Sequence, residues 1–362
     1  MSFSKTTSAS RLTASTLALC YCLLSGCDLS YLARGGYEAV RLLWNRKPIS
    51  SELATGDVSR DSRDKLETVL RVRDFAREQL GLNVGGAYET ITSVDAGAIT
   101  WVVMAAPRDS LTPYEWWFPI VGAVPYRGYF NKADAETEAR KLQDKGYDTF
   151  VRAAVAFSSL GWFDDPVLSN MLNLDRVELA SVIIHELFHR TYFAPGQVTF
   201  NESAANYVGD RGAADFFAAT SGAESEDAKA ARALMQSNLR FAEFLLQAEA
   251  QLLRLYSSKL PPAQILARRP AAFQKIQTDY AHLKPQLYGL SRFDLDEQPF
   301  NNAVFLSYRI YFHDLCDFAA VEALHHDDTR AAIAAIISLA KSNPSDPSYA
   351  IWQATQSGRS SP

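Results

Sequence analysis

The sequence has little cysteine, no excess of basic residues and no internal repeat. Four cysteines occur in 362 residues, and three of them, Cys20, Cys22 and Cys27, lie near the N-terminus. Cys316 is alone in the rest of the chain, which excludes an internal disulfide there, and we expect this thiol to be buried in an apolar helix. The formal net charge of -5, without a basic stripe, gives no electrostatic basis for binding nucleic acid.

The N-terminal segment predicts an exported, lipid-anchored chain. The apolar stretch from Leu12 to Leu24 is too short to span a bilayer comfortably, and Ser-Gly-Cys follows it. This pattern resembles a bacterial lipobox, in which a cysteine becomes the lipidated first residue. It predicts a signal peptide over residues 1–26, lipid on Cys27, and a periplasm-facing location in the bacterial cell envelope, with Asp28 favouring the inner membrane. An ordinary signal peptide or an uncleaved anchor is the alternative.

Hydrophobic periodicity predicts an α+β chain that is mostly helical. Helices are expected over residues 31–44, 61–80, 132–145, 174–192, 225–257, 263–283, 301–325 and 329–342, with another opening at 200–208, and strands over residues 98–106 and 148–158. Residues 115–124 form either a strand or an apolar loop. The expected organisation is an anchor segment at 27–60, a core at 61–222, a helical hairpin at 223–290, helices completing the core at 291–345, and a polar tail at 346–362.

The pentapeptide His-Glu-Leu-Phe-His lies at residues 185–189, within an apolar helical run. Positions i and i+4 lie on one face of a helix, so His185 and His189 can direct both imidazoles at one metal ion. Glu186 then lies beside the open coordination position, where a general base for water is needed. The pentapeptide therefore predicts one zinc ion and hydrolytic chemistry.

A catalytic zinc site needs a third protein ligand from a separate element. Glu202 is the best candidate, because it lies thirteen positions after His189, past a helix break. Asp210 and His313 are the alternatives. No Gly-x-x-His follows His189 at metzincin spacing, which argues against three histidine ligands. Asn206, one turn after Glu202, either orients a histidine ligand or faces solvent.

Hydrolysis of a peptide bond also needs a donor to the developing oxyanion. Tyr308 is the first candidate and Tyr311 the second, although each is equally well explained as a core aromatic residue of a helix. The strand expected at residues 148–158 precedes the motif helix. In many zinc peptidases of this type, such a strand is an edge that pairs with an extended substrate.

Several segments resemble a family of bacterial lipoproteins described as predicted zinc-dependent aminopeptidases. They are residues 31–49, ending Arg-Lys-Pro-Ile, Trp-Val-Val-Met-Ala-Ala-Pro at 101–107, Pro-Tyr-Arg-Gly-Tyr-Phe at 125–130, residues 156–166, the zinc motif, Phe-Asn-Glu at 200–202 and Phe-Asn-Asn-Ala at 300–303. The resemblance implies a thermolysin-like zinc-peptidase core, made of a small sheet and active-site helices with an added helical hairpin. It also implies His185, His189 and Glu202 as ligands and Glu186 as base. Arg190 departs from the uncharged residue that usually follows the second histidine.

The resemblance implies a peptide substrate, and the lipid implies membrane association. No residue assigns exopeptidase action, because the Gly-x-Met-Glu-Asn segment of one large aminopeptidase family is absent. A zinc endopeptidase acting on exported proteins and a zinc-binding lipoprotein scaffold are the competing interpretations. Glu186 argues against the scaffold, since a structural zinc site favours four protein ligands.

Overall fold

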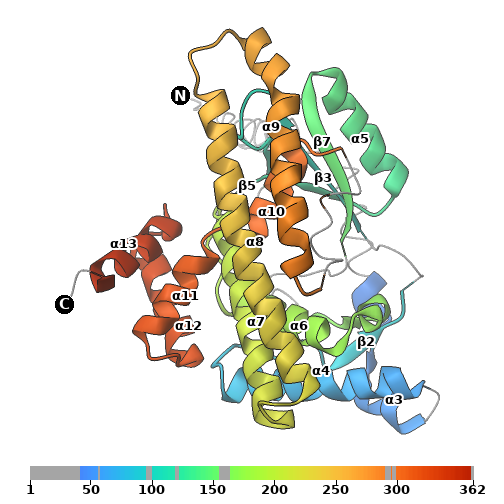
Figure 1. Cartoon of the computed structure of the whole chain (residues 1–362). Helices are drawn as coiled ribbons and strands as arrows, with labels where there is room; N and C mark the ends of the chain where they lie inside the picture. The colour runs from blue at the N-terminus through green and yellow to red at the C-terminus, as the bar shows by residue number, and fades with distance from the viewer. Residues whose placement is uncertain are drawn as a thin grey trace, which may run out of the picture.

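A computed structural model describes residues 41–55, 58–94, 100–118, 122–154, 164–289, 295 and 299–359 (Figure 1). This part of the chain is a mostly helical α+β structure with small sheets, as predicted. The expected signal peptide, Cys27 and residues 156–163 lie outside the described residues. In the described part, no helix combines the length and the apolar character that a membrane span requires.

The elements, in chain order, are β1 (Lys47–Pro48), α3 (Ile49–Thr55), α4 (Arg60–Glu78), β2 (Thr90–Thr92), β3 (Thr100–Pro107), β4 (Trp116–Phe118), β5 (Gly122–Val124), β6 (Arg127–Tyr129), α5 (Lys132–Asp144), β7 (Tyr147–Ala154), β8 (Val167–Leu168), η1 (Ser169–Asn173), α6 (Arg176–Thr191), α7 (Val198–Ser221), α8 (Glu226–Tyr256), α9 (Pro262–Leu283), η2 (Lys284–Gln286), α10 (Asn302–Phe312), α11 (Leu315–Leu324), α12 (Thr329–Ser342) and α13 (Pro347–Arg359). Most of the helices expected from the sequence are present at nearly the expected positions.

Helices α6 and α7 are adjacent in the sequence and pack tightly against each other. The side chain of Asp175 caps α6 by accepting a hydrogen bond from the amide of Glu178 at 2.8 Å. Gly209 of α7 allows the close approach, because a Cβ there would lie 2.6 Å from the carbonyl oxygen of Ser181 on α6. The zinc motif of α6 therefore lies directly against the first half of α7.

A three-stranded antiparallel sheet in the order β6-β3-β7 lies beside these helices. One face of the sheet packs against α5 through Val103, Ala105 and the apolar side of the helix. The opposite face, which includes Met104 and Arg152, faces α10. Smaller sheets are formed by β1-β2-β8, in which β2 and β8 are parallel, and by the β4-β5 hairpin.

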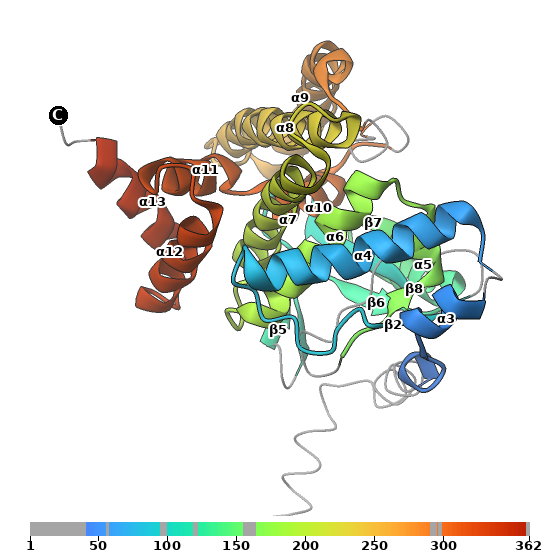
Figure 2. The same ribbon diagram turned by 90° about the horizontal axis from the view of Figure 1, so that it is seen from below.

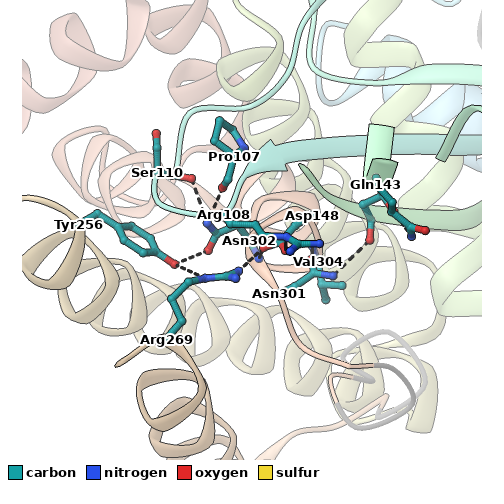
Figure 3. A network of polar contacts seen from close by, with 11 residues as sticks. Pro107, Arg108, Ser110, Gln143, Asp148, Tyr256, Arg269, Asn301, Asn302 and Val304 are labelled. Atoms are coloured by element: carbon teal, nitrogen blue, oxygen red, sulfur yellow. Dashed lines mark hydrogen bonds and ion pairs between the residues drawn. The ribbon is translucent and has the colours of Figure 1, made fainter. Parts of the chain in front are cut away.

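A polar network fixes the start of α10 against the end of the sheet (Figure 3). The side-chain amide of Asn302 donates to the carbonyls of Pro107 and Ser110 at 2.8 and 3.0 Å. Its backbone amide donates to Asp148 of β7 at 3.0 Å, and Asp148 also pairs with Arg269 of α9. The family-like segment Phe-Asn-Asn-Ala thus joins α10, β7 and the helical hairpin, which sets where α10 runs relative to β7.

The hairpin of α8 and α9 is present as expected, and α8 packs along α7 (Figure 1).

The single helix expected at residues 301–325 is instead two helices, α10 and α11. The backbone of Asp314 between them is left-handed, with φ 55°, so the chain changes direction there. Aspartate is among the few residues other than glycine that adopt this conformation readily.

Two further expectations for the C-terminal part are wrong. Cys316 is exposed rather than buried, because Leu315 and Phe318 form the inward side of α11. Residues 347–359 of the expected tail form α13, which buries Ile351 and Thr355 against its neighbours. Helices α11, α12 and α13 form a group on the other side of α7 and α8 from the β6-β3-β7 sheet (Figures 1 and 2).

Candidate metal centre

Three side chains converge between α6 and α7. The Nε2 atoms of His185 and His189 are 3.1 Å apart, and Oε2 of Glu202 lies 3.4 and 3.7 Å from them, respectively. Ligands about 2.05 Å from a tetrahedral zinc ion would lie about 3.3 Å from one another, a value inside this range. In the described residues, these three form the one group with the composition and spacing of a metal site. The three residues could therefore hold one metal ion, and their spacing is compatible with zinc.

Burial and mutual electrostatics shape this group. The side chains of His185, His189 and Glu202 are 14%, 3% and 13% exposed. Burial alone would raise the pKa of Glu202, but His189 and His185 outweigh it and hold the pKa well below its usual range. Burial opposes the charged form of His189, yet Glu202 raises the pKa of this imidazole. Glu202 is thus held in its negative form, and this carboxylate favours positive charge on the neighbouring groups, as a cation site requires.

Glu186 brings a carboxylate to the same region. Its Oε2 atom is buried and has no hydrogen-bond partner within the described structure. Burial is the main cause of the raised pKa values of Tyr88, Tyr126 and Tyr311, and the negative charge of Glu186 adds to each, so the carboxylate lies near enough to influence all three hydroxyls. A buried acceptor without a partner costs about 1–3 kcal/mol, which a water molecule bound beside Glu186 would offset.

The loop between α6 and α7 is closed by Asn201. Its side chain is completely buried and makes two hydrogen bonds to Ala194, one from the amide of Ala194 and one to its carbonyl, each 2.8 Å. Because Asn201 directly precedes Glu202, this clamp fixes the first turn of α7 and the position of the carboxylate. The Asn-Glu pair was singled out in the sequence, but this role of Asn201 was not predicted.

Tyr311 of α10 and Arg152 of β7 form the opposite side of the site. Nη2 of Arg152 donates to the hydroxyl oxygen of Tyr311 at 2.9 Å, and the guanidinium carbon lies 5.0 Å from the centre of the Tyr311 ring. The rings of Tyr311 and His185 are 6.4 Å apart, so one aromatic side chain separates the guanidinium from the ligands. Burial and the negative charge of Glu202 raise the pKa of Tyr311 to about 12, which keeps its proton in place at neutral pH.

The structure reverses the order of the two tyrosine candidates. Tyr308 packs edge-on against Phe241 of α8, with ring centres 5.7 Å apart; both tyrosines border the main hydrophobic core. Tyr311 lies three residues later on α10 and faces the metal ligands instead. The tyrosine that the sequence ranked second is therefore the one brought to the site.

Asn206 and the alternative third ligands have other partners. The side-chain nitrogen of Asn206 donates to the backbone carbonyl of Tyr311 at 3.0 Å, so Asn206 contacts α10 rather than a histidine ring. Asp210 accepts hydrogen bonds from Ser181 and Asn238. His313 lies beside Asp314. Neither alternative ligand joins the group formed by the two motif histidines and Glu202.

The loop before β2 supports the outer side of α6. Arg190, which departs from the uncharged residue that usually follows the second histidine, pairs with Asp164 at 2.9 Å, and its side chain is only 16% exposed. The backbone amide of Gly86 also donates to Asp164, at 3.1 Å. Gly85 leaves room for the guanidinium, because a Cβ there would lie 2.1 Å from Nη2 of Arg190. Arg190 thus holds the end of α6 in place.

Sequence reasoning missed Arg152, Tyr126 and Tyr88 as site residues. Tyr126 lies in the family-like segment Pro-Tyr-Arg-Gly-Tyr-Phe, which was noted for its resemblance alone. Arg152 is a charged residue within the apolar strand Phe-Val-Arg-Ala-Ala-Val, and that interruption was a usable signal. Nothing in the sequence near Tyr88 indicated that it would face Glu186; its left-handed backbone, with φ 59°, is a property of the folded loop.

Comparison with known proteins identifies the family. No curated protein and no solved structure matched the chain. A family model described as "Putative aminopeptidase" matches residues 30–349, which include every element from β1 to α12 and the whole candidate metal centre. The chain therefore belongs to this aminopeptidase family.

Proposed function

We propose that the protein is a zinc-dependent peptidase that removes amino-terminal residues from peptides. One observation carries the proposal. The two motif histidines and Glu202 converge at the spacing of zinc ligands, next to a buried carboxylate oxygen of Glu186 that has no partner in the described structure. Membership of an aminopeptidase family supports the reaction type.

The donor set favours zinc over harder cations. Two imidazole nitrogens and one carboxylate oxygen are typical ligands of catalytic zinc, which keeps a fourth position open, whereas magnesium and calcium prefer oxygen ligands. When bound here, zinc would lower the pKa of a coordinated water and polarise the scissile carbonyl. His185, His189 and Glu202 would hold it.

The remaining side chains have separate tasks in the proposed mechanism. Glu186 accepts a proton from the attacking water at Oε2 and delivers it to the leaving amine. The hydroxyl of Tyr311 donates a hydrogen bond to the oxyanion that develops on the scissile carbonyl and keeps its proton. Arg152 has only donors, so its hydrogen bond occupies the oxygen of Tyr311 and leaves the hydroxyl proton available.

Strand β7 is suited to hold the substrate backbone. It is an edge strand in the order β6-β3-β7, and it carries Arg152 toward the site. An extended peptide can add to such an edge through backbone hydrogen bonds. The strand expected at residues 148–158 is present as β7 up to residue 154, which supports this proposal, and residues 155–158 lie outside the described structure.

The proposal is tested by metal analysis and by substitution of the base. The purified protein should bind one zinc ion, and removal of the metal should abolish hydrolysis until zinc is restored. Glu186→Gln should lower kcat by at least a hundredfold and keep zinc bound. Glu178→Gln, on the same helix but in its first turn, is the matched control and should retain activity. Zinc binding without Glu186-dependent hydrolysis would instead indicate a scaffold.

Blocked and free peptides separate the two types of peptidase. An aminopeptidase should cleave peptides with a free amino terminus and leave their acetylated counterparts intact. Equal cleavage of both forms would identify an endopeptidase, with the same metal centre and the same base.

We also propose that lipid on Cys27 anchors the protein at the periplasmic side of the bacterial envelope. The Ser-Gly-Cys sequence after a short apolar stretch supports this proposal. Two or more acyl chains are needed for stable anchoring. The full-length protein should partition into the detergent phase and Cys27→Ser should not, while Cys316→Ser, the control thiol, should behave as wild type. Recovery of Cys27→Ser in the detergent phase would contradict lipid anchoring.

A further inference from the structure

Arg152 differs from four other buried or partly buried arginines of the described structure. Each of those four pairs with a carboxylate: Arg73 with Glu89, Arg190 with Asp164, Arg269 with Asp148 and Arg309 with Glu249. Within the described structure, Arg152 makes one hydrogen bond, to the neutral hydroxyl of Tyr311, and has no carboxylate oxygen within 4.0 Å. Its Nε atom is buried without a partner in the described structure, as is that of Arg73, so the missing carboxylate is what distinguishes Arg152.

A desolvated guanidinium without an anion is unfavourable, because burial removes water that the charge would otherwise bind. Arginine cannot escape this penalty by losing its proton. The planar guanidinium matches a carboxylate in geometry and charge, and such pairs are among the strongest hydrogen-bonded contacts in proteins. Arg152 therefore has the properties of a receptor for a carboxylate supplied from outside the chain.

The position of Arg152 relates this carboxylate to the scissile bond. The Tyr311 ring lies 5.0 Å from the guanidinium carbon of Arg152 and 6.4 Å from the His185 ring, so Arg152 lies near the candidate ligands. Burial opposes the charge of Arg152, whereas Tyr311 and the negative charge of Glu202 favour it and raise its pKa. The free ammonium of an aminopeptidase substrate would be repelled by this cation. Arg152 must therefore face the leaving-group side of the substrate. One residue of extended peptide spans roughly 3.3–3.6 Å, so a carboxylate one or two residues beyond the scissile bond can reach it.

We propose that Arg152 binds a substrate carboxylate on the leaving-group side of the scissile bond, and that the enzyme acts preferentially on dipeptides and tripeptides with a free C-terminal carboxylate. This inference rests on the proposed peptidase function and adds the substrate class. An acidic side chain directly after the scissile bond would present the same chemistry, so the two sources of carboxylate are compared directly.

The test compares substrates that differ only in this charge. The kcat/KM of zinc-loaded wild-type enzyme is measured on Leu-Ala, Leu-Ala amide, Leu-Asn amide and Leu-Asp amide. Loss of one charge-assisted contact corresponds to about a tenfold to hundredfold effect. Leu-Ala should therefore exceed its amide by about that factor. Preference for Leu-Asp amide over Leu-Asn amide, without preference for Leu-Ala, would assign the contact to side chains and overturn the short-peptide specificity.

Substitution of Arg152 assigns the preference to this residue. Arg152→Gln should bring the ratio of free acid to amide close to one, and Arg152→Lys should restore part of it. The ratio is informative because any disturbance of Tyr311 affects both substrates and cancels. Arg140→Gln, in an exposed arginine of α5, is the control and should keep the wild-type ratio. A wild-type ratio in Arg152→Gln would overturn the proposal.

A binding measurement keeps this inference separate from turnover. In Glu186→Gln, the Kd of Leu-Ala and of its amide can be measured by calorimetry without hydrolysis. Tighter binding of the free acid, lost on adding Arg152→Gln, supports the carboxylate site even if the natural bond cleaved is of another kind. Equal Kd values for acid and amide would overturn it, while Glu186-dependent hydrolysis by wild type would leave the peptidase proposal intact.

Discussion

The contact between Gly209 and α6 allows a quantitative test of how the metal centre is assembled. A Cβ at position 209 would lie 2.6 Å from the carbonyl oxygen of Ser181 and 3.2 Å from Cβ of His185. In an α-helix, the carbonyl of residue 181 accepts the amide of residue 185. The extra methyl group of Gly209→Ala would therefore press on the hydrogen bond that positions the first ligand histidine.

The expected effect is the difference between two opposing contributions. Overpacking of a rigid backbone contact destabilises by about 1–3 kcal/mol. Alanine in a helix stabilises by about 0.8–1.0 kcal/mol relative to glycine. We therefore expect Gly209→Ala to lower the free energy of unfolding by about 0–2 kcal/mol, and to weaken zinc binding because α6 and α7 must move apart.

Gly212→Ala is the matched control, one turn further along α7. Its new Cβ would approach side-chain atoms only, the nearest being Cδ1 of Leu80 at 2.8 Å and Cδ1 of Ile184 at 3.0 Å. These side-chain ends can rotate away, so helix propensity should offset most of the penalty and zinc affinity should be retained. Urea unfolding of the metal-free proteins and zinc titration against a chelator measure both quantities. Equal stability and equal zinc affinity of the two variants would refute the reasoning.

Three further results are expected. Tyr311→Phe should lower kcat about a hundredfold to a thousandfold with zinc still bound, as for loss of an oxyanion donor, whereas Tyr308→Phe should have little effect on kcat; the reverse order would return Tyr308 to the mechanism. Asn201→Ala removes two buried hydrogen bonds and should lower the free energy of unfolding by about 1–3 kcal/mol and weaken zinc binding, while unchanged zinc affinity would contradict its positioning role. Burial opposes ionisation of Asp314, but His313 lowers the pKa of this carboxyl below 3.8. The ionised carboxylate therefore stabilises the fold above that pH, and this stabilisation is lost as the pH falls further. In Asp314→Asn, the free energy of unfolding should depend less on pH below about pH 4, and a pH profile identical to that of wild type would contradict this assignment.

The convergence of the three candidate ligands could be predicted because their geometry is local. The spacing of His185 and His189 fixes their relative direction on any α-helix, and Glu202 follows after one helix break. Most helices were likewise predicted from their periodicity and capping residues. These features depend on residues that are neighbours in the sequence, where elementary stereochemistry determines the outcome.

The other side of the site could not be derived in this way. Whether Tyr308 or Tyr311 faces the metal depends on how α10 rotates against α8 and the sheet, and the two positions are equally apolar in the sequence. The left-handed turn at Asp314 lacks the glycine or proline that usually signals such a break. Helix α13 was missed because its buried residues, including Ile351 and Thr355, lie among polar ones.

The two sides of the site have different structural origins, and this has a mechanistic consequence. Helices α6 and α7 alone supply the candidate metal ligands and the proposed base, whereas the proposed oxyanion donor requires α10 and β7 to be in register. Asp148 and Asn302 impose this register at the far end of both elements (Figure 3). Zinc binding should therefore tolerate disturbance of that network better than catalysis does, because the network positions Tyr311 and Arg152 without contacting a ligand. The polar contacts at the end of the sheet are in this sense part of the catalytic arrangement.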